Sequence, residues 1–416
     1  MNLSKQRALS IFADVAAATC DGIGVTRESF GIGEEKAIQV LERHVMLLGL
    51  CSTRDALQNL WITLDNNVSD EPYIIIGSHV DSVPLGGNFD GLAGVVAGML
   101  VLLNIKERAL LTKVPVKVLA LRGEESAWYG KAYIGSSALL GKLDVRELAN
   151  LHRSGQGSLS EAMLTTGVDL SIIQAGKAFI DMKNVLAFLE LHIEQGPVMV
   201  ARQWPIAVVT GIRGNIRHNL IRCIGETGHS GAVPRWLRKD AMLAVAELLS
   251  RMDEHWRVLL QMGMDLVMTA GICTTTPSSH AVSVIPGEVQ FSFEVRSQDA
   301  DTLERFYTLM QEECESIGRA RQVIFEFDRK IATAAASMAP EWIARFKQSA
   351  AARGGVKLES IPSGAGHDAA VFANAGIPSA MIFVRNENGS HNPKEAMDMD
   401  DFLIGVTLLA DGICDL

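Results

Sequence analysis

The hydrophobic pattern of the chain predicts short buried strands that alternate with helices. Apolar runs at 73–78, 114–121 and 185–193 each lead into a polar segment and have the length of strands. Between the first two, GLAGVVAGMLVLLNI from Gly91 is almost wholly apolar and predicts a buried helix. Such alternation is typical of an α/β domain with a mostly parallel central sheet, in which ligands bind beyond the carboxyl ends of the strands.

A different pattern occupies residues 209–330. Strand-like segments and two amphipathic helices follow one another in a β-α-β-β-α-β order, which predicts a smaller α+β sandwich domain. Helical and apolar segments then return up to the C-terminus. We therefore expect a discontinuous larger domain, residues 1–208 and 331–416, into which residues 209–330 are inserted.

Length, charge and cysteine content narrow the classes of protein to consider. A chain of 416 residues is longer than a single-core domain usually is, so two domains are expected. Its net charge of −10 argues against nucleic acid or an anionic membrane as a partner. No stretch approaches the roughly 18 apolar residues of a membrane span. Six cysteines without a C-x-x-C pair predict free thiols. We expect a cytoplasmic protein.

Five residues at strand ends or on loops belong to metal-ligating types. Imidazole and carboxylate ligands suit zinc or a neighbouring metal such as manganese, cobalt or nickel. Two such ions about 3.5–4 Å apart can hold a bridging hydroxide and polarise a carbonyl together. Taken singly, each residue also fits a structural role: a bonded core histidine, a helix N-cap, a solvated turn or a polar loop. Taken together, they predict two divalent metal ions bound by His79, Asp90, Glu125, His192 and His391.

Two further carboxylates stand beside these candidate ligands. Asp81 faces the same side of an extended segment as His79 and can orient its imidazole. Glu124 and Glu125 end a buried apolar strand, where two carboxylates would be costly without cations. We expect Glu125 to bind metal and Glu124 to act as the general base.

Seven motifs in a fixed order carry a family resemblance. They are GSHVDSVPLGGNFDGLAGV, RGEES, ELHIEQGPV, GHSGAVP, VIPGEVQFSFEVRS, SGAGHDA and GSHNPKE. With them the chain resembles the M20 metallopeptidase superfamily, and within it the amidase, hydantoinase and carbamoylase group. That group includes N-carbamoyl-L-amino acid hydrolases and allantoate amidohydrolases. The resemblance implies that Asp90 bridges two metals, one completed by His79 and His192, the other by Glu125 and His391.

The resemblance also implies roles in substrate binding. His229 matches a histidine of the small lid domain that stabilises the oxyanion in the partner subunit's active site, which implies a homodimer. Arg296 matches an arginine that binds the substrate carboxylate, and Gln195 a residue near the ureido group. Ser283 stands where an asparagine that contacts the substrate is usual, although His280 nearby could compensate. His367 and Asp368 match a motif near the site.

The expected activity is hydrolysis of the carbamoyl (ureido) or amide C–N bond of a small N-carbamoyl amino acid or ureido acid. Two alternatives stay open within the resemblance: an aminoacylase or peptidase, and hydrolysis of a different amide. His192 argues against the first, because those branches tend to carry a carboxylate there. A non-catalytic binding protein is the alternative of another class, which the complete set of ligands and base disfavours.

Overall fold

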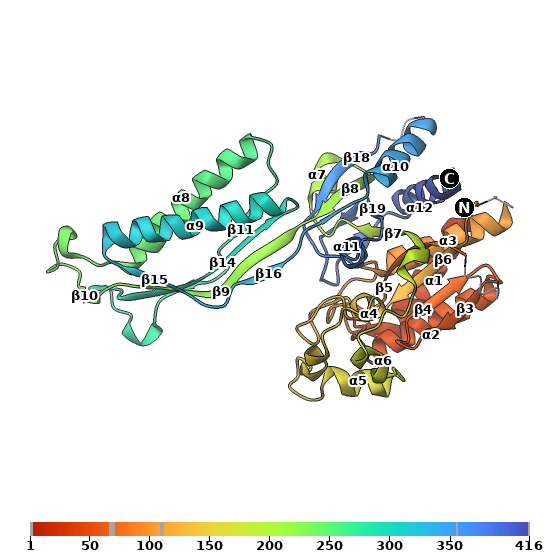
Figure 1. Ribbon diagram of the computed structural model, residues 1–416, viewed down its shortest axis with the longest axis horizontal. Coiled ribbons are helices and arrows are strands. Elements are labelled where there is room, and N and C mark those ends of the chain that lie inside the picture. The colour runs from red at the N-terminus through yellow and green to blue at the C-terminus, as the bar shows by residue number, and fades with distance from the viewer. Residues whose placement is uncertain (1–2, 66–70, 109–111, 355–356, 415–416) are drawn as a thin grey trace. The chain divides into compact units, whose positions relative to one another are not determined.

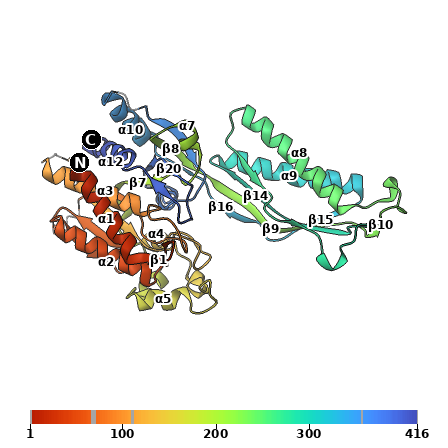
Figure 2. The same ribbon diagram turned by 180° about the vertical axis from the view of Figure 1, so that it is seen from behind.

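The chain divides into two compact units. The computed structural model describes residues 3–65, 71–108, 112–354 and 357–414 (Figures 1 and 2). The large unit comprises Met1–Thr210 and Ser337–Leu416, and the inserted unit comprises Gly211–Ala336. The sequence-based expectation was an inserted domain at residues 209–330, which starts two residues and ends six residues before this unit.

A mixed sheet forms the centre of the large unit. Its strand order is β17-β8-β19-β7-β5-β6-β4-β3, with β18 paired to β8. The four central strands β19, β7, β5 and β6 are parallel, whereas β8, β4 and β3 pair antiparallel. The predicted parallel sheet is thus confined to the centre. The strands are β3 (Cys51–Arg54), β4 (Leu60–Thr63), β5 (Tyr73–His79), β6 (Val116–Leu121), β7 (Val185–Ile193), β8 (Ile206–Ile212), β17 (Ala336–Ser337), β18 (Glu359–Ser363) and β19 (Ser379–Val384).

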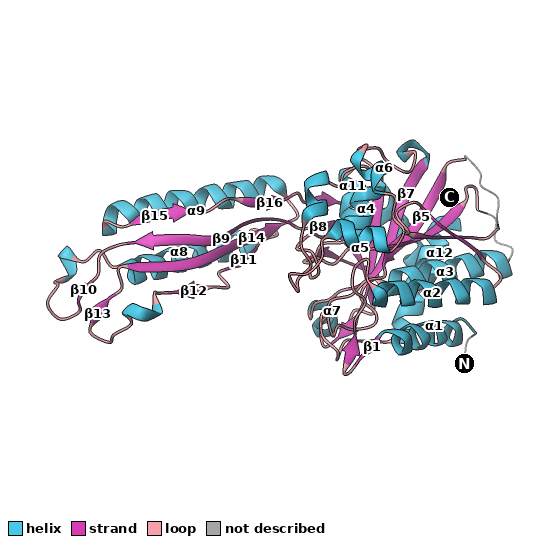
Figure 3. Ribbon diagram, turned by 90° about the horizontal axis from the view of Figure 1, so that it is seen from below, coloured by secondary structure: helices cyan, strands magenta, loops and turns pink. Residues whose placement is uncertain are grey.

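Helices cover both faces of this sheet. Figure 3 shows α1, α2, α3 and α12 on one face and α4 and α11 on the other. Both faces of β5 are therefore shielded from water, which explains why all its residues are buried and its apolar run does not alternate with polar residues. The helices are α1 (Leu3–Thr19), α2 (Ile32–Leu47), α3 (Leu92–Glu107), α4 (Ile134–Leu139), α5 (Leu159–Thr165), α6 (Leu170–Gln174), α7 (Val198–Arg202), α10 (Pro340–Ala352), α11 (Asp368–Asn374) and α12 (Met399–Cys414).

Helix α3 lies very close to the sheet because its sequence supplies small residues. A Cβ on Gly94 would lie 2.5 Å from the Leu191 carbonyl oxygen of β7 and 2.6 Å from Cβ of Ser78. Only glycine tolerates this approach without a backbone shift. The close contact fixes the start of α3, and with it the loop before the helix, against the ends of β5 and β7.

The inserted unit is a sheet with two helices. Its strand order is β11-β14-β9-β15, with β12 paired to β14 and β16 to β9. Buried and partly exposed residues alternate along β14, as expected when one face of a sheet is covered. The elements are β9 (Gly214–Ile224), β10 (Gly228–His229), α8 (Ala241–Gln261), β11 (Val267–Thr269), β12 (Cys273–Thr274), β13 (Val284–Ile285), β14 (Glu288–Ser297), α9 (Ala300–Arg321), β15 (Ile324–Phe327) and β16 (Ile331–Thr333).

The strand directions place the candidate ligands at one edge of the large unit. His79 is the last residue of β5, His192 is the penultimate residue of β7, and Glu124 and Glu125 follow β6. Because these three strands are adjacent and parallel, their carboxyl ends meet at the same edge. Among the described residues, no helix is both long and apolar enough to span a membrane.

Candidate metal centre

Five side chains from five separate segments converge at this edge. Potential ligand atoms of His79, Asp90 and His192 lie within 4.8 Å of one another, and so do those of Asp90, Glu125 and His391. These two groups share Asp90. The structure therefore brings together all five candidate ligands, in the two sets that the resemblance implies.

Asp90 is the centre of the cluster. Its Oδ1 lies 3.5 Å from His79 Nε2 and 3.2 Å from His192 Nε2. Its Oδ2 lies 3.3 Å from His391 Nε2, which in turn is 3.2 Å from Glu125 Oε1. Each oxygen of Asp90 thus faces a different pair of candidate ligands.

The two buried histidines are oriented through their second nitrogen. Nδ1 of His79 lies 3.1 Å from the Asp81 carbonyl oxygen, and Nδ1 of His192 lies 2.9 Å from the Ile193 carbonyl oxygen. A carbonyl only accepts, so both Nδ1 atoms carry the hydrogen. In the neutral ring, Nε2 then carries a lone pair near the Asp90 carboxylate, and Nε2 of His192 also accepts a hydrogen bond from the Gly91 N–H at 3.1 Å. Metal-ligating histidines are usually held in this way.

These contacts test whether the site fits a cation. A lone pair and a carboxylate oxygen repel each other unless a proton or a cation lies between them. Asp90 Oδ1 is buried and has no hydrogen-bond partner. Ligands about 2.1 Å from one tetrahedral ion lie about 3.4 Å from each other, which agrees with the 3.2–3.5 Å between Asp90 Oδ1 and the two imidazoles. The residues present therefore fit divalent cations.

The loop that carries Asp90 depends on two glycines. A Cβ on Gly87 would lie 2.2 Å from the carboxyl carbon of Glu395, and one on Gly91 would lie 2.5 Å from the His79 ring. Gly91 also has φ of +66° and is itself the N-cap residue of α3. The helix N-cap role considered for Asp90 is therefore wrong: its carboxylate points to the imidazoles.

Burial and charge shift the protonation of the cluster. Burial lowers the pKa of His79, but Asp81 and Asp90 outweigh it and raise that pKa well above its usual range. Burial alone would raise the pKa of Asp90, yet the three imidazoles hold it well below its usual range. Burial raises the pKa of Glu124 well above its usual range and raises that of Glu125. Without cations, His79, Glu124 and Glu125 therefore hold their protons more tightly than the same groups do in water.

The Asp81 carboxylate contacts the backbone more than the imidazole. Its oxygens accept hydrogen bonds of 3.0 Å from the N–H groups of Glu124 and Glu125 and one of 2.6 Å from Ser29 Oγ. Asp81 Oδ1 is 3.3 Å from His79 Nδ1. Its orienting contact to His79 was expected, whereas its hold on the Glu124–Glu125 turn could not be read from the sequence.

Other buried or partly buried polar residues around the cluster were not identified from the sequence. Glu395 Oε1 accepts from the N–H groups of Phe89 and Asp90, while Ser390 Oγ lies 2.5 Å from Asp90 Oδ2 and 2.6 Å from Glu395 Oε2. Arg27, fully buried, donates to the Val80 carbonyl. Glu395 and Ser390 lie within the quoted GSHNPKE motif, which could have suggested them.

A second buried group adjoins the first. Ligand-type atoms of Glu190, His192 and His367 lie within 4.8 Å of one another. Glu190 accepts from Ser78 Oγ and the Ala369 N–H, and Asp368 accepts from Ser136 Oγ. Burial and the charge of Glu190 raise the pKa of Asp368 to about 7. His367 and Asp368 thus lie beside the cluster, as the SGAGHDA motif suggested.

Gln195 is at the open side of the cluster. Its Nε2 donates to Asp90 Oδ2 at 2.7 Å and lies 3.4 Å from His391 Nε2. Gln195 and His391 both have positive φ, 63° and 60°. Such strained backbone is common at functional sites and persists only when its surroundings hold it.

The remaining predicted residues lie in the inserted unit. His229 is exposed on β10, which pairs with β13, and the Ser230 N–H donates to the Ser283 carbonyl at 2.8 Å. His229 and Ser283 are therefore neighbours. Arg296 is on β14, where its Nη2 lies 3.0 Å from Glu294 Oε1.

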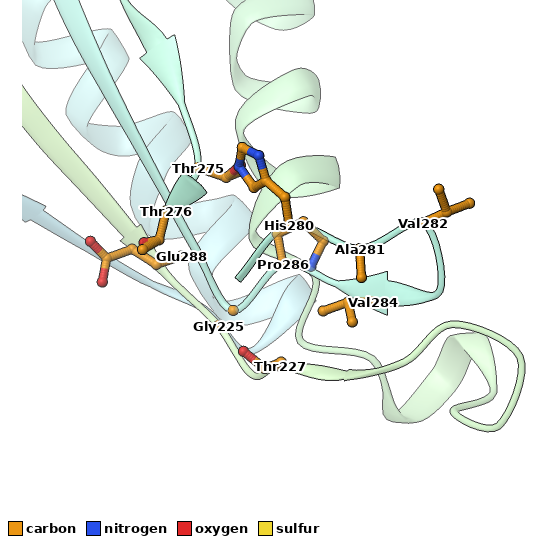
Figure 4. A pocket seen from close by; sticks show the side chains of 11 residues that line it. Gly225, Thr227, Thr275, Thr276, His280, Ala281, Val282, Val284, Pro286 and Glu288 are labelled. Atoms are coloured by element: carbon orange, nitrogen blue, oxygen red, sulfur yellow. The ribbon is translucent and has the colours of Figure 1, made fainter. Parts of the chain in front are cut away.

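His280 lines a pocket of about 680 Å³ in the inserted unit. Figure 4 shows its ring beside Thr275, whose Oγ1 lies 2.5 Å from His280 Nε2, and Val284 of β13 on another wall. His280 is thus close in the chain to Ser283 but engaged with a threonine of its own loop.

Comparisons with known proteins agree with the motifs. The model of peptidase family M20/M25/M40 matches residues 75–414. The chain is 33% identical to an N-carbamoyl-L-amino acid amidohydrolase of Geobacillus stearothermophilus, covering 93% of this chain and 92% of the relative. It is 31% identical to an allantoate amidohydrolase of Bacillus subtilis, with coverages of 95% and 93%. A crystal structure of a hydantoinase/carbamoylase family amidase from Burkholderia multivorans matches with a TM-score of 0.86 at 25% identity, covering 99% of this chain and 97% of the other.

The pKa shifts in the cluster predict how the affinity for metal should depend on pH. Asp90 and Glu125 raise the pKa of His391 to about 11, and burial together with Asp90 raises that of Glu395 to about 7. At pH 7 the metal-free site therefore holds protons that a cation must displace. Metal binding should release protons and tighten as pH rises from about 6 to 8, and it should keep tightening at higher pH, because the His391 proton is lost only near pH 11.

Calorimetric titration of the metal-free protein with Zn²⁺ or Mn²⁺, in buffers of different ionisation enthalpy, measures this release directly. His391→Ala should release fewer protons than the wild type. Metal binding without proton release, at an affinity independent of pH, would contradict this electrostatic description.

Proposed function

The chain belongs to peptidase family M20/M25/M40, and from that premise we propose that it hydrolyses the carbamoyl (ureido) or amide C–N bond of a small N-carbamoyl amino acid or ureido acid. The observation that carries the proposal is the buried Asp90 between three imidazoles, with Glu124 beside them. Relatives named as N-carbamoyl-L-amino acid and allantoate amidohydrolases support the type of bond.

We propose two divalent ions in each subunit, zinc or one of its neighbours in the first row. Members of the family depend on metal ions, and this chain offers two ligand groups that share Asp90. His79 and His192 would hold one ion, and Glu125 and His391 the other. When bound, such ions polarise a carbonyl and make a water molecule more acidic.

Glu124 is the group that moves the proton in this proposal. Its carboxylate is nearly buried, and Oε2 lies 3.9 Å from His79 Nε2, beside the ligands without being one of them. A carboxylate at this position can take up a proton and give it back. Glu124 would take a proton from the attacking water and deliver it to the leaving nitrogen.

The substrate residues are proposed from the family motifs. Arg296 would bind a carboxylate of the substrate with its planar fork, and Gln195 would contact the ureido group at the edge of the cluster. His229 would stabilise the oxyanion in the partner subunit of a homodimer, with Ser283 next to it. The exposed imidazole of His229 is available for such a contact. We further propose a cytoplasmic location, which the free cysteines support.

The proposed reaction predicts ammonia release that depends on metal. Wild-type protein should release ammonia from at least one of N-carbamoyl amino acids, allantoate or ureidoglycolate, faster than it cleaves N-acetyl amino acids or dipeptides. Chelation should abolish the activity, and Zn²⁺, Mn²⁺, Co²⁺ or Ni²⁺ should restore it. Cleavage of the acyl substrates alone would identify an aminoacylase or peptidase instead.

Substitution should separate the base from the ligand. Glu124→Gln should retain metal and lose about 100-fold or more in turnover, because an amide cannot accept the proton. Glu125→Gln should also lower metal content, since it removes a ligand. Turnover and elemental analysis of both variants check this. Near-normal turnover of Glu124→Gln would reject the base assignment.

Mixing inactive subunits should test the role of His229. Heterodimers of Glu124→Gln and His229→Ala chains contain one intact site if His229 acts on the partner. Random pairing makes half of the dimers mixed, so activity should return to about a quarter of the wild-type value. The mixed dimer should be isolated with two affinity tags. An isolated mixed dimer without activity would show that His229 does not act across subunits.

A further inference from the structure

The turn that presents Glu124 and Glu125 is held through all four of its backbone N–H groups and three of its carbonyls. Along Arg122–Glu125, the four N–H groups donate to side chains: Arg122 to Asn59 Oδ1 at 3.1 Å, Gly123 to Glu34 Oε1 at 2.9 Å, and Glu124 and Glu125 to Asp81 at 3.0 Å. The carbonyls of residues 122, 123 and 124 accept from the N–H groups of residues 135, 134 and 133. A turn with so many partners has little freedom to move.

Of the three side chains that accept from the N–H groups of this turn, Glu34 is the farthest from it in the sequence. It lies in the first turn of α2 and is fully buried. Its Oε2 accepts from Arg122 Nε at 2.6 Å and from the Phe30 N–H at 2.8 Å, while Oε1 accepts from the Gly123 N–H. One carboxylate thus holds both the backbone and the side chain of the residues that precede Glu124.

The conformation of Gly123 makes this support necessary. Gly123 has φ of +66°, and a Cβ there would lie 2.8 Å from the Phe30 ring. Glycine reaches this conformation easily but also leaves it easily, because it has the greatest backbone freedom. Glu34 and the Phe30 ring restrain this one flexible residue of the turn.

The two carboxylates that hold the turn are joined through one short segment. Ser29 Oγ donates to Asp81 at 2.6 Å, and the next residue, Phe30, donates its N–H to Glu34. Asp81 holds the half of the turn that carries the N–H groups of Glu124 and Glu125, and Glu34 holds the half before it.

Stability alone does not account for a charged pair at this place. Glu34 and Arg122 both have 0% exposed side chains. Burial raises the pKa of Glu34 to about 7 even though Arg122 lowers it. Buried ion pairs can often be replaced by apolar residues with little loss of stability. A carboxylate, however, is the one side chain here that can accept from a guanidinium and two backbone N–H groups together.

We propose that Glu34 is a positioning residue, which places the proposed base Glu124 and the proposed ligand Glu125 through its bonds to Gly123 and Arg122. The inference rests on the proposed function, because it assigns Glu34 a task in that reaction. Glu34 touches neither substrate nor metal in this scheme and acts only through the turn.

The test is Glu34→Gln, which keeps the shape but places an NH₂ group among three N–H donors. In the metal-loaded enzyme, turnover should fall about 10- to 100-fold, as expected when a reacting group is displaced, while KM stays within about twofold. Metal affinity measured by calorimetry on the metal-free protein should also fall, because Glu125 shares the turn. Hydrogen exchange of peptides covering residues 119–128 should be faster than in the wild type.

Two variants of the same helix serve as controls. Glu35→Gln makes the same substitution one residue later and removes the charge and one acceptor oxygen beside Arg122 Nη2, but leaves the Gly123 bond to Glu34 intact. Ile38→Val lowers stability in the core of the large unit without touching the turn. Both should keep wild-type turnover and wild-type exchange at 119–128. If Glu34→Gln does not fold, Glu34→Asp, which keeps the charge but withdraws the carboxylate, should show the same fall in turnover.

The outcomes distinguish this inference from the proposed function. Wild type inactive on every ureido substrate would reject the proposed function, and exchange and metal affinity would still report on the turn. An active wild type with unchanged turnover and unchanged exchange in folded Glu34→Gln would overturn the positioning role. An equal loss of turnover in Ile38→Val would also overturn it, because the effect would then be one of general stability.

Discussion

The structure depends on a concentration of negative charge that is buried away from water. Asp81, Asp90, Glu124, Glu125, Glu190, Asp368 and Glu395 are all less than 9% exposed. The nearby cationic side chain of Arg27 is fully buried, but it donates its hydrogen bonds to the Val80 carbonyl and the Asn88 side-chain amide and not to these carboxylates. Isolated buried carboxylates are very costly, so the group must hold protons or bind cations. The imidazoles and carboxylates gathered around Asp90 are of the types that bind divalent cations.

The fold holds this charge in place mainly with the backbone. Parallel strands deliver His79 and His192 to one edge, and the missing Cβ atoms of Gly87 and Gly91 let the Asp90 loop close against them. Asp81, Glu34 and Glu395 each accept N–H groups from a loop that carries a proposed ligand or the proposed base. Several carboxylates thus serve as backbone acceptors around those that face the site.

Periodicity and motif order were enough to predict the main elements, because each is specified locally. The β7 strand was predicted at 185–193, its observed bounds. Contacts between distant segments leave no such local signal. Nothing in α2 pointed to Glu34, which meets Arg122 across the unit, and a helix N-cap was an alternative for Asp90 by sequence. The antiparallel edge strands were likewise missed, since their pairing is decided by the fold and not by composition.

The central claim, that the buried charge is built to hold a pair of divalent cations, is tested most directly by anomalous diffraction. Crystals of metal-loaded protein should be measured on both sides of the absorption edge of the bound metal. Two anomalous peaks about 3.5–4 Å apart, on either side of the Asp90 carboxylate, are predicted. One should be bonded to His79 and His192 and the other to Glu125 and His391. Full occupancy by metal at another location, with no peak beside Asp90, would contradict the account.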